Sequence, residues 1–528
     1  MPQRGLTRAA ILFLAAGVMA GARADLLPSS VPLTAEASVD EAPGIYDVKA
    51  FGARGDGKTL DTEAVQQAIE QASAHGGGKV RCPAGAYPCL SIHLRSNIAL
   101  YLDQGASLIA ADPGAMTGYD PPEPNQWDAF QDFGHSHWHN SLIWGEQVEN
   151  VSILGPGLIW GRGLTRNDDV PKGGGNKSIS LKLCRNVIIK DLSMLHGGHF
   201  AILATGVDNL TIDNLKIDTN RDGIDIDCCR NVRVSNCSVN SPFDDGICPK
   251  SSYALGFPRA TENLTITNCQ VSGYDEGTFL NGTYKREYQK FSHGSPTGRI
   301  KFGTESNGGF KNIAISNCVF DYSRGLALET VDGGLLEDVT ITNITMRDIS
   351  GAPIFMRLGN RARGPKGSTP VGALRRVIIS NVVVYNADPK YSSIISGIPR
   401  HPIEDLTLSN IRIYCRGGGT KEQAALDPAE KEKDYPEPYM FGEMPAYGFF
   451  IRHVQGLEMS DVDVALMSPD QRPAFVLDGV KGADFVHVKA ASAAGAPTFV
   501  LKSVEDFSTR MCWPAADKRI ERATLERL

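Results

Sequence analysis

Long apolar runs, basic clusters and zinc-type cysteine pairs are all absent from most of this sequence. After residue 24, no apolar run approaches the roughly 20 residues that a membrane-spanning helix needs. Lys and Arg number 53 against 60 Asp and Glu, a formal net charge of −7, which argues against a nucleic-acid coat or a polybasic membrane anchor. None of the cysteines forms a Cys-x-x-Cys pair, so we expect no zinc site. With 42% hydrophobic and 21% charged residues, the composition is globular and excludes a disordered, collagen-like or coiled-coil chain.

The first residues have the pattern of a targeting segment. Arg4 and Arg8 precede an apolar stretch from Ala9 to Ala20, and Ala22-Arg23-Ala24 has the small-residue form of a cleavage site. The stretch is too short to span a bilayer. We therefore predict a signal peptide over residues 1–24 and export to the periplasm or the medium. A membrane anchor is the alternative.

A ten-residue pattern recurs down the chain. The shortest spacings between copies are 22 to 26 residues, and longer spacings contain inserts. Self-similarity at such a period is typical of stacked repeats. The copies occupy 186–195, 209–218, 231–240, 263–272, 312–321, 338–347, 376–385, 405–414 and 456–465, with an earlier copy beginning at Asn150.

Each copy is consistent with two short strands joined at a corner. The first two apolar positions alternate with polar residues, which is strand periodicity. The phase then shifts by one at a position that holds Asn or Asp in the nine copies from 186 to 465, as in Asn236 and Asp461. These are the non-glycine residues that best tolerate a left-handed backbone. We predict an all-β, single-stranded right-handed parallel β-helix, a pectate-lyase-like solenoid with an asparagine ladder at one corner. A leucine-rich solenoid is the alternative fold, but valine and isoleucine dominate the repeat.

Several segments outside the repeat can be assigned from the same pattern. Residues 61–74 have helical apolar spacing and end before Gly76-Gly77-Gly78, so we predict a helix that caps the open end of the solenoid. A glycine-rich phosphate loop is the alternative for this region. Cys237, Cys269 and Cys318 share one repeat position, which predicts an inward column of buried thiols. Cys82 and Cys89 are close enough in sequence for a short-range disulfide.

Acidic residues recur at one position after the corner. When the strands after the corner are aligned through their small residues, the residues just before that point are, in chain order, His199, Asp222, Asp245, Glu276 and Arg324. We predict that these residues form one outward-facing column, with Asp244 beside Asp245 and Arg221 beside Asp222. Like charges packed together raise at least one pKa, and glycosidic hydrolysis needs one protonated carboxyl with one or two carboxylates. A calcium site and a solvated acidic stripe are the alternatives.

These motifs resemble glycoside hydrolase family 28, the polygalacturonases, over roughly residues 45–415. The N-terminal FGARGDG segment belongs to the likeness, the family's Asn-Thr-Asp-Gly stands here as residues 220–223, and its Gly-Asp-Asp with a following lysine stands as Phe243-Asp244-Asp245 with Lys250. The resemblance implies that Asp244 is the general acid and that Asp222 and Asp245 hold the nucleophilic water. It also implies inversion at the anomeric carbon and neither metal nor organic cofactor. Neighbouring rungs lie about 5 Å apart, whereas inversion requires about 6.5–9.5 Å between acid and base, so the side chains would have to splay.

Substrate contacts are predicted from the column, from a histidine cluster and from long inserts. His135, His137 and His139 alternate with other residues, so we expect three imidazoles on one face, for substrate contact, metal binding or packing. The inserts at 273–311, 351–375 and 415–455 are long enough to carry binding. Lys285, Arg286 and Lys290 in the first insert could bind carboxylates or be solvated. The predicted substrate-binding residues are Arg221, Lys250, Glu276, Arg299, Lys301, Arg324, His199 and His137.

Two departures from the family pattern bear on the substrate. No histidine remains in 297–304, where the family has Gly-His-Gly, and the family's Arg-Ile-Lys, which binds a galacturonate carboxylate, falls on Ala327-Leu328-Glu329. Either Arg299, Lys301 or Arg324 supplies the cations from another rung, or the sugar there is neutral. We expect the second case, and hence a pectic substrate such as rhamnogalacturonan or a substituted side chain rather than plain homogalacturonan.

The full set of predictions is then a monomeric secreted pectic hydrolase with one catalytic domain. The signal peptide covers 1–24, a linker 25–44, the β-helix 45–505 and a C-terminal tail 506–528. Within the tail, the residues after Cys512 are expected to be a short helix or disordered. We expect neither a nucleic-acid partner nor, after cleavage of the signal peptide, an association with a membrane. A non-catalytic carbohydrate-binding β-helix and a calcium-dependent polysaccharide lyase are the alternative functions. The sequence does not decide between endo and exo attack.

Overall fold

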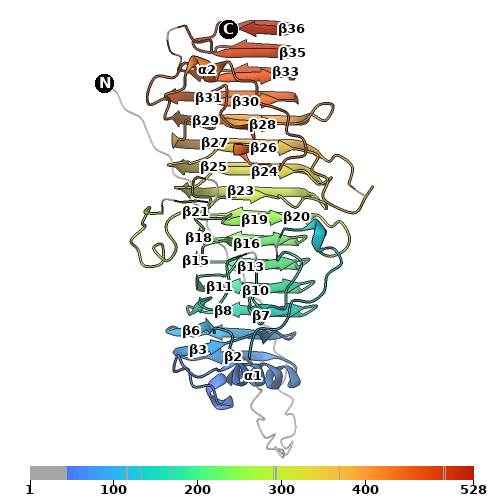
Figure 1. Ribbon diagram of the computed structural model, residues 1–528, viewed down its shortest axis with the longest axis vertical. Coiled ribbons are helices and arrows are strands. Elements are labelled where there is room, and N and C mark those ends of the chain that lie inside the picture. The colour runs from blue at the N-terminus through green and yellow to red at the C-terminus, as the bar shows by residue number, and fades with distance from the viewer. Residues whose placement is uncertain are drawn as a thin grey trace, which may run out of the picture. The chain divides into compact units, whose positions relative to one another are not determined.

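The computed structural model describes residues 44–528 except 115–116, 133, 168, 289, 292–293, 368, 492 and 494. The predicted signal peptide and all but the last residue of the predicted linker lie outside the described residues. The described residues form one compact unit, in which strands stack in parallel rungs (Figure 1). The predicted parallel β-helix is therefore confirmed.

Three rows of strands run along the stack, each strand pairing with its equivalent on the next rung. The first row contains β1 (Ile45–Asp47), β2 (Gly78–Cys82), β5 (Ile98–Leu102), β8 (Glu149–Leu154), β11 (Arg185–Lys190), β14 (Asp208–Asp213), β17 (Arg230–Ser235), β20 (Thr261–Thr267), β23 (Phe310–Asp321), β25 (Leu335–Arg347), β27 (Ala373–Ala387), β29 (Ile403–Cys415), β31 (Val454–Leu466), β33 (Lys481–Val486) and β35 (Phe499–Arg510).

The second row is built from short strands that merge into the first row from β23 onward. It contains β3 (Gly85–Cys89), β6 (Ala106–Ala110), β9 (Leu158–Trp160), β12 (Ser193–Leu195), β15 (Lys216–Asp218), β18 (Ser238–Asn240), β21 (Gln270–Ser272) and, near the C-terminal end, β34 (Lys489–Ala490).

The third row carries most of the residues that the sequence singled out. It begins with β4 (Ile92–His93), β7 (Ser141–Glu146), β10 (Lys177–Lys182), β13 (Phe200–Thr205), β16 (Asp222–Asp227) and β19 (Ile247–Lys250). A bridge between Ile247 and Ile300 continues it to β22 (Lys301–Phe302), β24 (Leu326–Thr330), β26 (Ile354–Leu358), β28 (Ser393–Ser396), β30 (Phe449–Arg452) and β32 (Phe475–Asp478).

The predicted asparagine ladder is present at the corner between the first two rows. Every Asn or Asp at that repeat position has a positive φ, for example 57° at Asn236 and 54° at Asp461. The side chains also bond between rungs, as from Asn214 Nδ2 to Asp191 Oδ1 at 2.8 Å and from Asn317 Nδ2 to Asn268 Oδ1 at 3.2 Å. A left-handed corner would cost another residue roughly 1–2 kcal/mol, so the ladder holds the strand phase shift in place.

A second ladder, which we did not predict, runs along the first residue of the copies that begin with Asn. Asn186, Asn209 and Asn231 also have positive φ, and each donates from Nδ2 to Oδ1 of the asparagine one rung before it, at 2.9, 2.9 and 3.3 Å. The sequence signal was the Asn that opens most copies. These asparagines lie inside the first-row strands rather than at a turn between rows, as Asn186 does in β11 and Asn209 in β14.

The interior is filled by the inward columns of the repeat. Cys237, Cys269 and Cys318 are buried and form no disulfide. Their thiols donate to backbone carbonyls at 3.2, 3.3 and 3.3 Å, so the predicted column of buried thiols is confirmed. Cys82 and Cys89 are free, so the possible disulfide is not formed. Valine, isoleucine and leucine, together with phenylalanines such as Phe475 and Phe499, make up most of one continuous core.

The ends of the stack are closed in different ways. Helix α1 (Thr62–Ala74), preceded by the 3₁₀ helix η1 (Val48–Phe51), caps the N-terminal end as predicted (Figure 1). The loop before α1 does not offer its backbone to a phosphate, because the N–H groups of Arg54 and Gly55 donate to the Asp61 carboxylate at 2.7 and 2.9 Å.

At the other end, the prediction of a short helix or disorder after Cys512 is wrong. β36 (Lys518–Arg527) folds back antiparallel on β35. A parallel stack leaves an unpaired strand edge at its end, and edges of this kind are normally covered. The tail contains many charged residues, such as Lys518 and Glu526, and its sequence alone does not predict a strand. The strand forms because it pairs with the exposed edge of β35.

Candidate active site

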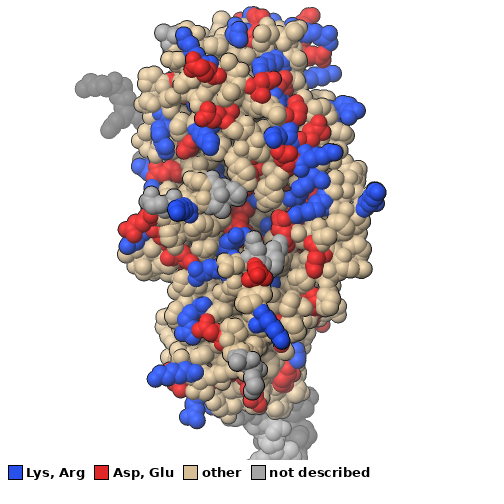
Figure 2. Space-filling model, in the orientation of Figure 1, with Lys and Arg blue, Asp and Glu red and all other residues tan. Residues whose placement is uncertain are grey.

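The three carboxylates predicted to be catalytic meet on the third row. Asp222 begins β16, and Asp244 and Asp245 lie in the turn before β19. Because Ile224 pairs with Ile247, Asp222 and Asp245 occupy equivalent positions on adjacent rungs. Each of the three offers a carboxylate oxygen, and these oxygens all lie within 4.8 Å of one another. Figure 2 shows acidic and basic side chains next to one another near the middle of this face.

Asp245 is held as an anion. Its side chain is 2% exposed; Arg299 Nε lies 2.8 Å from its Oδ1, and Lys301 Nζ lies 3.2 Å from its Oδ2. Burial by itself would raise the pKa of Asp245, but Lys301 and Arg299 outweigh it and bring the pKa well below its usual range. Asp245 is therefore charged throughout the neutral and mildly acidic range and can accept a proton.

Asp222 lies in the opposite environment. The residue is buried, and its Oδ1 has no hydrogen-bond partner among the described residues. Burial, followed by the charges of Asp225 and Asp244, raises the pKa of Asp222 well above its usual value. Neighbouring carboxyls whose pKa values are pushed apart are the arrangement that acid–base catalysis uses.

Asp244 is the accessible member of the cluster. Its side chain is 26% exposed, Arg221 Nε lies 3.0 Å from its Oδ2, and its Oδ1 accepts from the Asp245 N–H at 3.1 Å. Arg221 Nη2 also lies 3.3 Å from His199 Nε2. Burial and Arg221 lower the pKa of His199 well below its usual value, so His199 is neutral and Nε2 accepts from Arg221.

The predicted column is correct for Asp222, Asp245 and Arg324 but wrong for His199 and Glu276. Phe200, not His199, pairs with Asp222. After Asp245, the pairings of Ile247 with Ile300 and of Lys301 with Ala327 place Gly298 and then Arg324 at the equivalent position. The chain forms the insert after β21 before it makes the next rung, so Glu276, which belongs to the insert, cannot lie in the column.

Glu276 lies instead in a separate group with His196 and Arg166. Its carboxylate contacts His196 Nδ1 at 2.7 Å and Arg166 Nη1 at 2.8 Å, and its side chain is 4% exposed. The cationic residues predicted in and at the end of this insert lie in two different places. Arg286 pairs with Asp321 and Asp348 and Lys285 with Glu287 on the surface, whereas Arg299 and Lys301 lie against Asp245.

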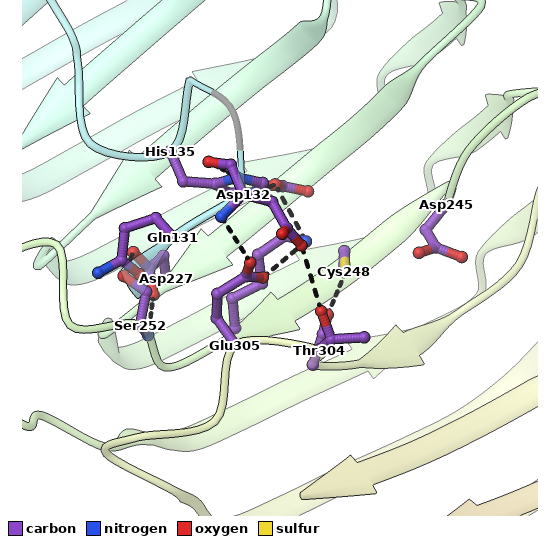
Figure 3. Close-up of polar contacts among 12 residues, drawn as sticks. Gln131, Asp132, His135, Asp227, Asp245, Cys248, Ser252, Thr304 and Glu305 are labelled. Atoms are coloured by element: carbon purple, nitrogen blue, oxygen red, sulfur yellow. Dashed lines mark hydrogen bonds and ion pairs between the residues drawn. The ribbon is translucent and has the colours of Figure 1, made fainter. Parts of the chain in front are cut away.

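Lys250 belongs to a buried network behind the carboxylates. Its Nζ lies 3.8 Å from Asp225 Oδ2 and 3.5 Å from Glu305 Oε2, and His135 Nε2 lies 3.1 Å from the same Asp225 oxygen. Figure 3 shows His135 and Asp132 reaching down from the loop between β6 and β7 toward Glu305, with Asp245 farther along the sheet. We had not predicted Asp225; its signal was the Asp-Gly-Ile-Asp spacing, which places both acids on β16.

The three histidines before β7 do not share a face. His135 contacts Asp225, His137 donates from Nδ1 to the Glu123 carbonyl at 2.7 Å, and His139 Nε2 lies 2.9 Å from Glu146. The predicted alternation fails because residues 134–136 form a turn rather than a strand. Among the described residues, the groups that could hold a metal ion contain His135 with Asp222 and Asp225, or Asp222 with Asp244 and Asp245, and neither contains His137 or His139.

The sequence did not reveal Glu437 as a site residue. It lies in the segment 416–448, between β29 and β30, next to the 3₁₀ helix η3 (Pro438–Phe441). Its carboxylate contacts Arg299, Lys301 and Arg324. Nothing in the repeat pattern links this segment to Asp245, because the segment is an insert with no copy of the repeat.

Comparison with known proteins identifies the family. The model of glycosyl hydrolases family 28 matches residues 126–431, more than half of the chain. A Vitis vinifera protein named "Probable polygalacturonase" is 25% identical over 400 residues, covering 70% of this chain and 74% of its own. The "Exo-poly-alpha-D-galacturonosidase" of Dickeya chrysanthemi is 26% identical over 236 residues, covering 42% of this chain and 37% of its own.

Solved structures share the fold. The family 28 exopolygalacturonase of Yersinia enterocolitica aligns with a TM-score of 0.60 and 19% identity, over 84% of this chain and 78% of that one. The hyperthermoactive exopolygalacturonase of Thermotoga maritima aligns with a TM-score of 0.53 and 17% identity, over 92% of this chain and 94% of that one.

Proposed function

The chain belongs to family 28 of the glycosyl hydrolases, and from this membership we propose that it hydrolyses glycosidic bonds of a pectic polysaccharide with inversion. As a member it is a glycosidase. The observation that supports the proposed roles is the meeting of three carboxylates with unequal environments, within 4.8 Å of one another. The comparisons do not favour a calcium-dependent lyase or a non-catalytic binding protein over a hydrolase, because the family model and the relatives matched over most of the chain are glycosidases.

The proposed mechanism uses each carboxylate in its own environment. Asp245, kept charged by Arg299 and Lys301, takes a proton from the attacking water, which Asp222 helps to hold. Asp244 protonates the leaving oxygen. Arg221, 3.0 Å from Asp244, then stabilises the carboxylate that remains. The high pKa of Asp222 keeps one proton inside the cluster of the free enzyme.

The spacing of the cluster sets a requirement on this mechanism. The carboxylate oxygens lie within 4.8 Å of one another, which is shorter than the about 6.5–9.5 Å typical of inverting acid–base pairs. Asp244 is the member that can move outward, because its side chain is 26% exposed. Its movement toward the leaving oxygen on substrate entry would open the separation that inversion requires.

Substitution of the acid tests this proposal. Asp244→Asn is nearly isosteric but cannot donate the proton, so we expect kcat to fall about 10²–10⁴-fold, with unchanged circular dichroism and unfolding midpoint. Asp169→Asn, on the exposed part of a loop, is the matched control and should leave reducing-sugar release unchanged. A variant at Asp244 that keeps more than about a tenth of the activity would contradict the assignment of the acid.

We also propose attack from a chain end. The third row is covered on both sides of the carboxylates. Toward the N-terminus Phe200 and Leu203 are fully buried, packed against Trp138 of the loop between β6 and β7. Toward the C-terminus Arg299 and Arg324 are buried beside Glu437 of the segment 416–448. A polysaccharide lying along the row would meet both covering segments, so we expect the cluster to accept the end of a chain.

Product analysis distinguishes exo from endo attack. Exo attack releases small sugars from the first minutes while the viscosity of the substrate solution falls slowly. Endo attack lowers viscosity first and yields a ladder of oligosaccharides. The Dickeya chrysanthemi relative carries an exo-type name, which supports the first outcome. An early oligosaccharide ladder would show that the two covering segments open in solution.

The sugar beside the scissile bond is proposed to be neutral. At the position where the family's Arg-Ile-Lys falls, Glu329 is fully buried, with neither carboxylate oxygen hydrogen-bonded among the described residues. Burial raises its pKa to about 8. We expect kcat/KM on rhamnogalacturonan or a branched pectin to exceed that on polygalacturonate. An equal or higher value on polygalacturonate would contradict the proposal without affecting the carboxylate roles.

Export and a monomeric state complete the proposal. Among the described residues, no helix is both long and apolar enough to cross a membrane. N-terminal sequencing of the exported protein should begin at Asp25, directly after the predicted cleavage site. Light scattering after size exclusion should give the mass of one chain.

A further inference from the structure

The segment 416–448, here called the strap, is fixed across the third row. Arg357 Nη2 donates to the carbonyls of Glu430 and Lys431 at 2.8 and 2.9 Å, and Arg452 Nη1 donates to the Pro428 carbonyl at 2.6 Å. Both arginines are buried, and Phe441 of the strap packs in a separate apolar cluster that includes Phe355 and Phe450. The strap contains α2 (Lys421–Ala424) and η3. Its anchors give it one defined position over the site.

The strap inserts one carboxylate among the cations beside the proposed base. Glu437, whose side chain is 6% exposed, contacts Arg299 Nη2, with Lys301 Nζ at 3.8 Å and Arg324 Nη1 at 3.5 Å. Although burial would raise the pKa of Glu437, Arg299 and Arg324 lower it, so it is charged. Arg299 and Lys301 are the same two cations that hold Asp245.

Glu437 therefore occupies the position that an acidic sugar would need. A uronate carboxylate is recognised by guanidinium and ammonium groups, and this cluster offers three. Each of the three already contacts at least one carboxylate of the protein, and all are 5% exposed or less. An incoming uronate could reach them only by displacing Glu437, and would otherwise meet a fixed negative charge. Such like-charge contacts discriminate strongly between ligands.

We infer that Glu437 is a specificity-determining residue, which excludes a uronate from the sugar position beside Asp245 and so selects a neutral sugar there. The inference rests on the proposed function, because it presumes a pectic substrate cleaved at this cluster. It assigns the selection to the strap rather than to the repeat. The repeat supplies the carboxylates and the cations, and the strap determines whether those cations are available.

Two variants of Glu437 test the inference. Glu437→Gln keeps the size of the side chain and removes its charge, and Glu437→Ala also opens the space above Arg299 and Arg324. We expect the ratio of kcat/KM on polygalacturonate to that on rhamnogalacturonan to rise at least tenfold in Glu437→Ala and to a smaller extent in Glu437→Gln. Glu443→Gln is the matched control, because Glu443 lies on the strap and bonds to Gln423 on the surface; it should leave the ratio unchanged.

A binding measurement separates this inference from the proposed function. Calorimetric titration of the full-length wild type and the Glu437 variants with digalacturonate and with a neutral disaccharide reports selection without turnover. Tighter binding of digalacturonate in both variants, at unchanged affinity for the neutral sugar, is the expected result. An unchanged kcat/KM ratio together with unchanged digalacturonate affinity in folded variants would overturn the inference. If the Glu437 variants bind digalacturonate more tightly but the wild type cleaves no pectic polymer, the proposed function alone is refuted.

Discussion

Removal of Arg299 should disturb stability and the pH profile together. Its side chain is 1% exposed, and it bridges Asp245, at 2.8 Å from Nε, and Glu437. Arg299→Met keeps much of the apolar volume but leaves two buried carboxylates with Lys301 as their shared cation. Removing one partner of a buried ion pair typically costs about 3–5 kcal/mol. We expect the free energy of unfolding in urea at pH 7 to fall by about that amount.

The direction of the pH effect follows from the pKa of Asp245. That pKa is depressed in the folded protein, so the ion pair contributes stability above the pKa of the unfolded carboxyl and loses it as pH falls through the folded value. An opposite charge within about 4–6 Å lowers a carboxyl pKa by roughly 1–3 units. Without Arg299 the folded pKa of Asp245 rises, and the acidic limb of kcat/KM should move to higher pH by a similar amount.

The matched control is Arg286→Met. Arg286 also bridges two carboxylates, at 3.1 Å from Asp321 and 2.8 Å from Asp348, but its side chain is 37% exposed. Exposed ion pairs contribute about 0–1 kcal/mol to stability. The free energy of unfolding of this variant should therefore change by no more than about that amount, and its pH profile should not change. If Arg299→Met folds and its acidic limb stays where the wild type's lies, then Arg299 does not set the charge of Asp245 and the proposed base is wrong.

Three further measurements test other parts of the structure. Proton NMR during early hydrolysis should show the inverted anomer as the first product; first appearance of the retained anomer would mean that the close carboxylates act by double displacement. Asn236→Ala, at φ 57° and with its Nδ2 2.7 Å from Asp213 Oδ1, should lower the free energy of unfolding in urea by about 1–2 kcal/mol, and Asn236→Gly should lose less; equal losses would show that the left-handed backbone is not the source. Thiol titration of the denatured, unreduced protein should detect all 11 cysteines, with an unfolding midpoint unaffected by reductant; a lower thiol count would reveal a disulfide.

The sequence was sufficient for the scaffold because the scaffold repeats. The corner position holds Asn or Asp in the nine copies from 186 to 465, and the backbone there is left-handed in all nine, as at Asn343 and Asn410. The same regularity placed Asp222 and Asp245 on adjacent rungs. The second ladder was visible in the repeat as its opening Asn, but an Asn before a strand is also an ordinary turn residue, so only the side-chain bonds between rungs reveal it.

The site was less predictable wherever an insert interrupts the rungs. Glu276 follows β21 at the spacing of a new rung, but the chain leaves the stack there, and Gly298 lies next to Asp245 instead. His199 was placed one residue out because a glycine step fixes the register only to within a residue, and a shift of one moves a side chain to the other face of a strand. Glu437 is beyond any local pattern, since its position depends on how the strap is anchored.

Catalysis and substrate choice therefore come from different parts of the chain but share two side chains. The rungs place Asp222, Asp244 and Asp245, whereas the strap brings Glu437 from an insert. Arg299 and Lys301 contact both Asp245 and Glu437, so they join the two functions electrostatically. A change at Glu437 should thus alter which sugar is accepted and, through Arg299, modestly alter the pKa of the base. It should leave the stereochemistry of the product untouched, because the positions of the carboxylates are set by the rungs.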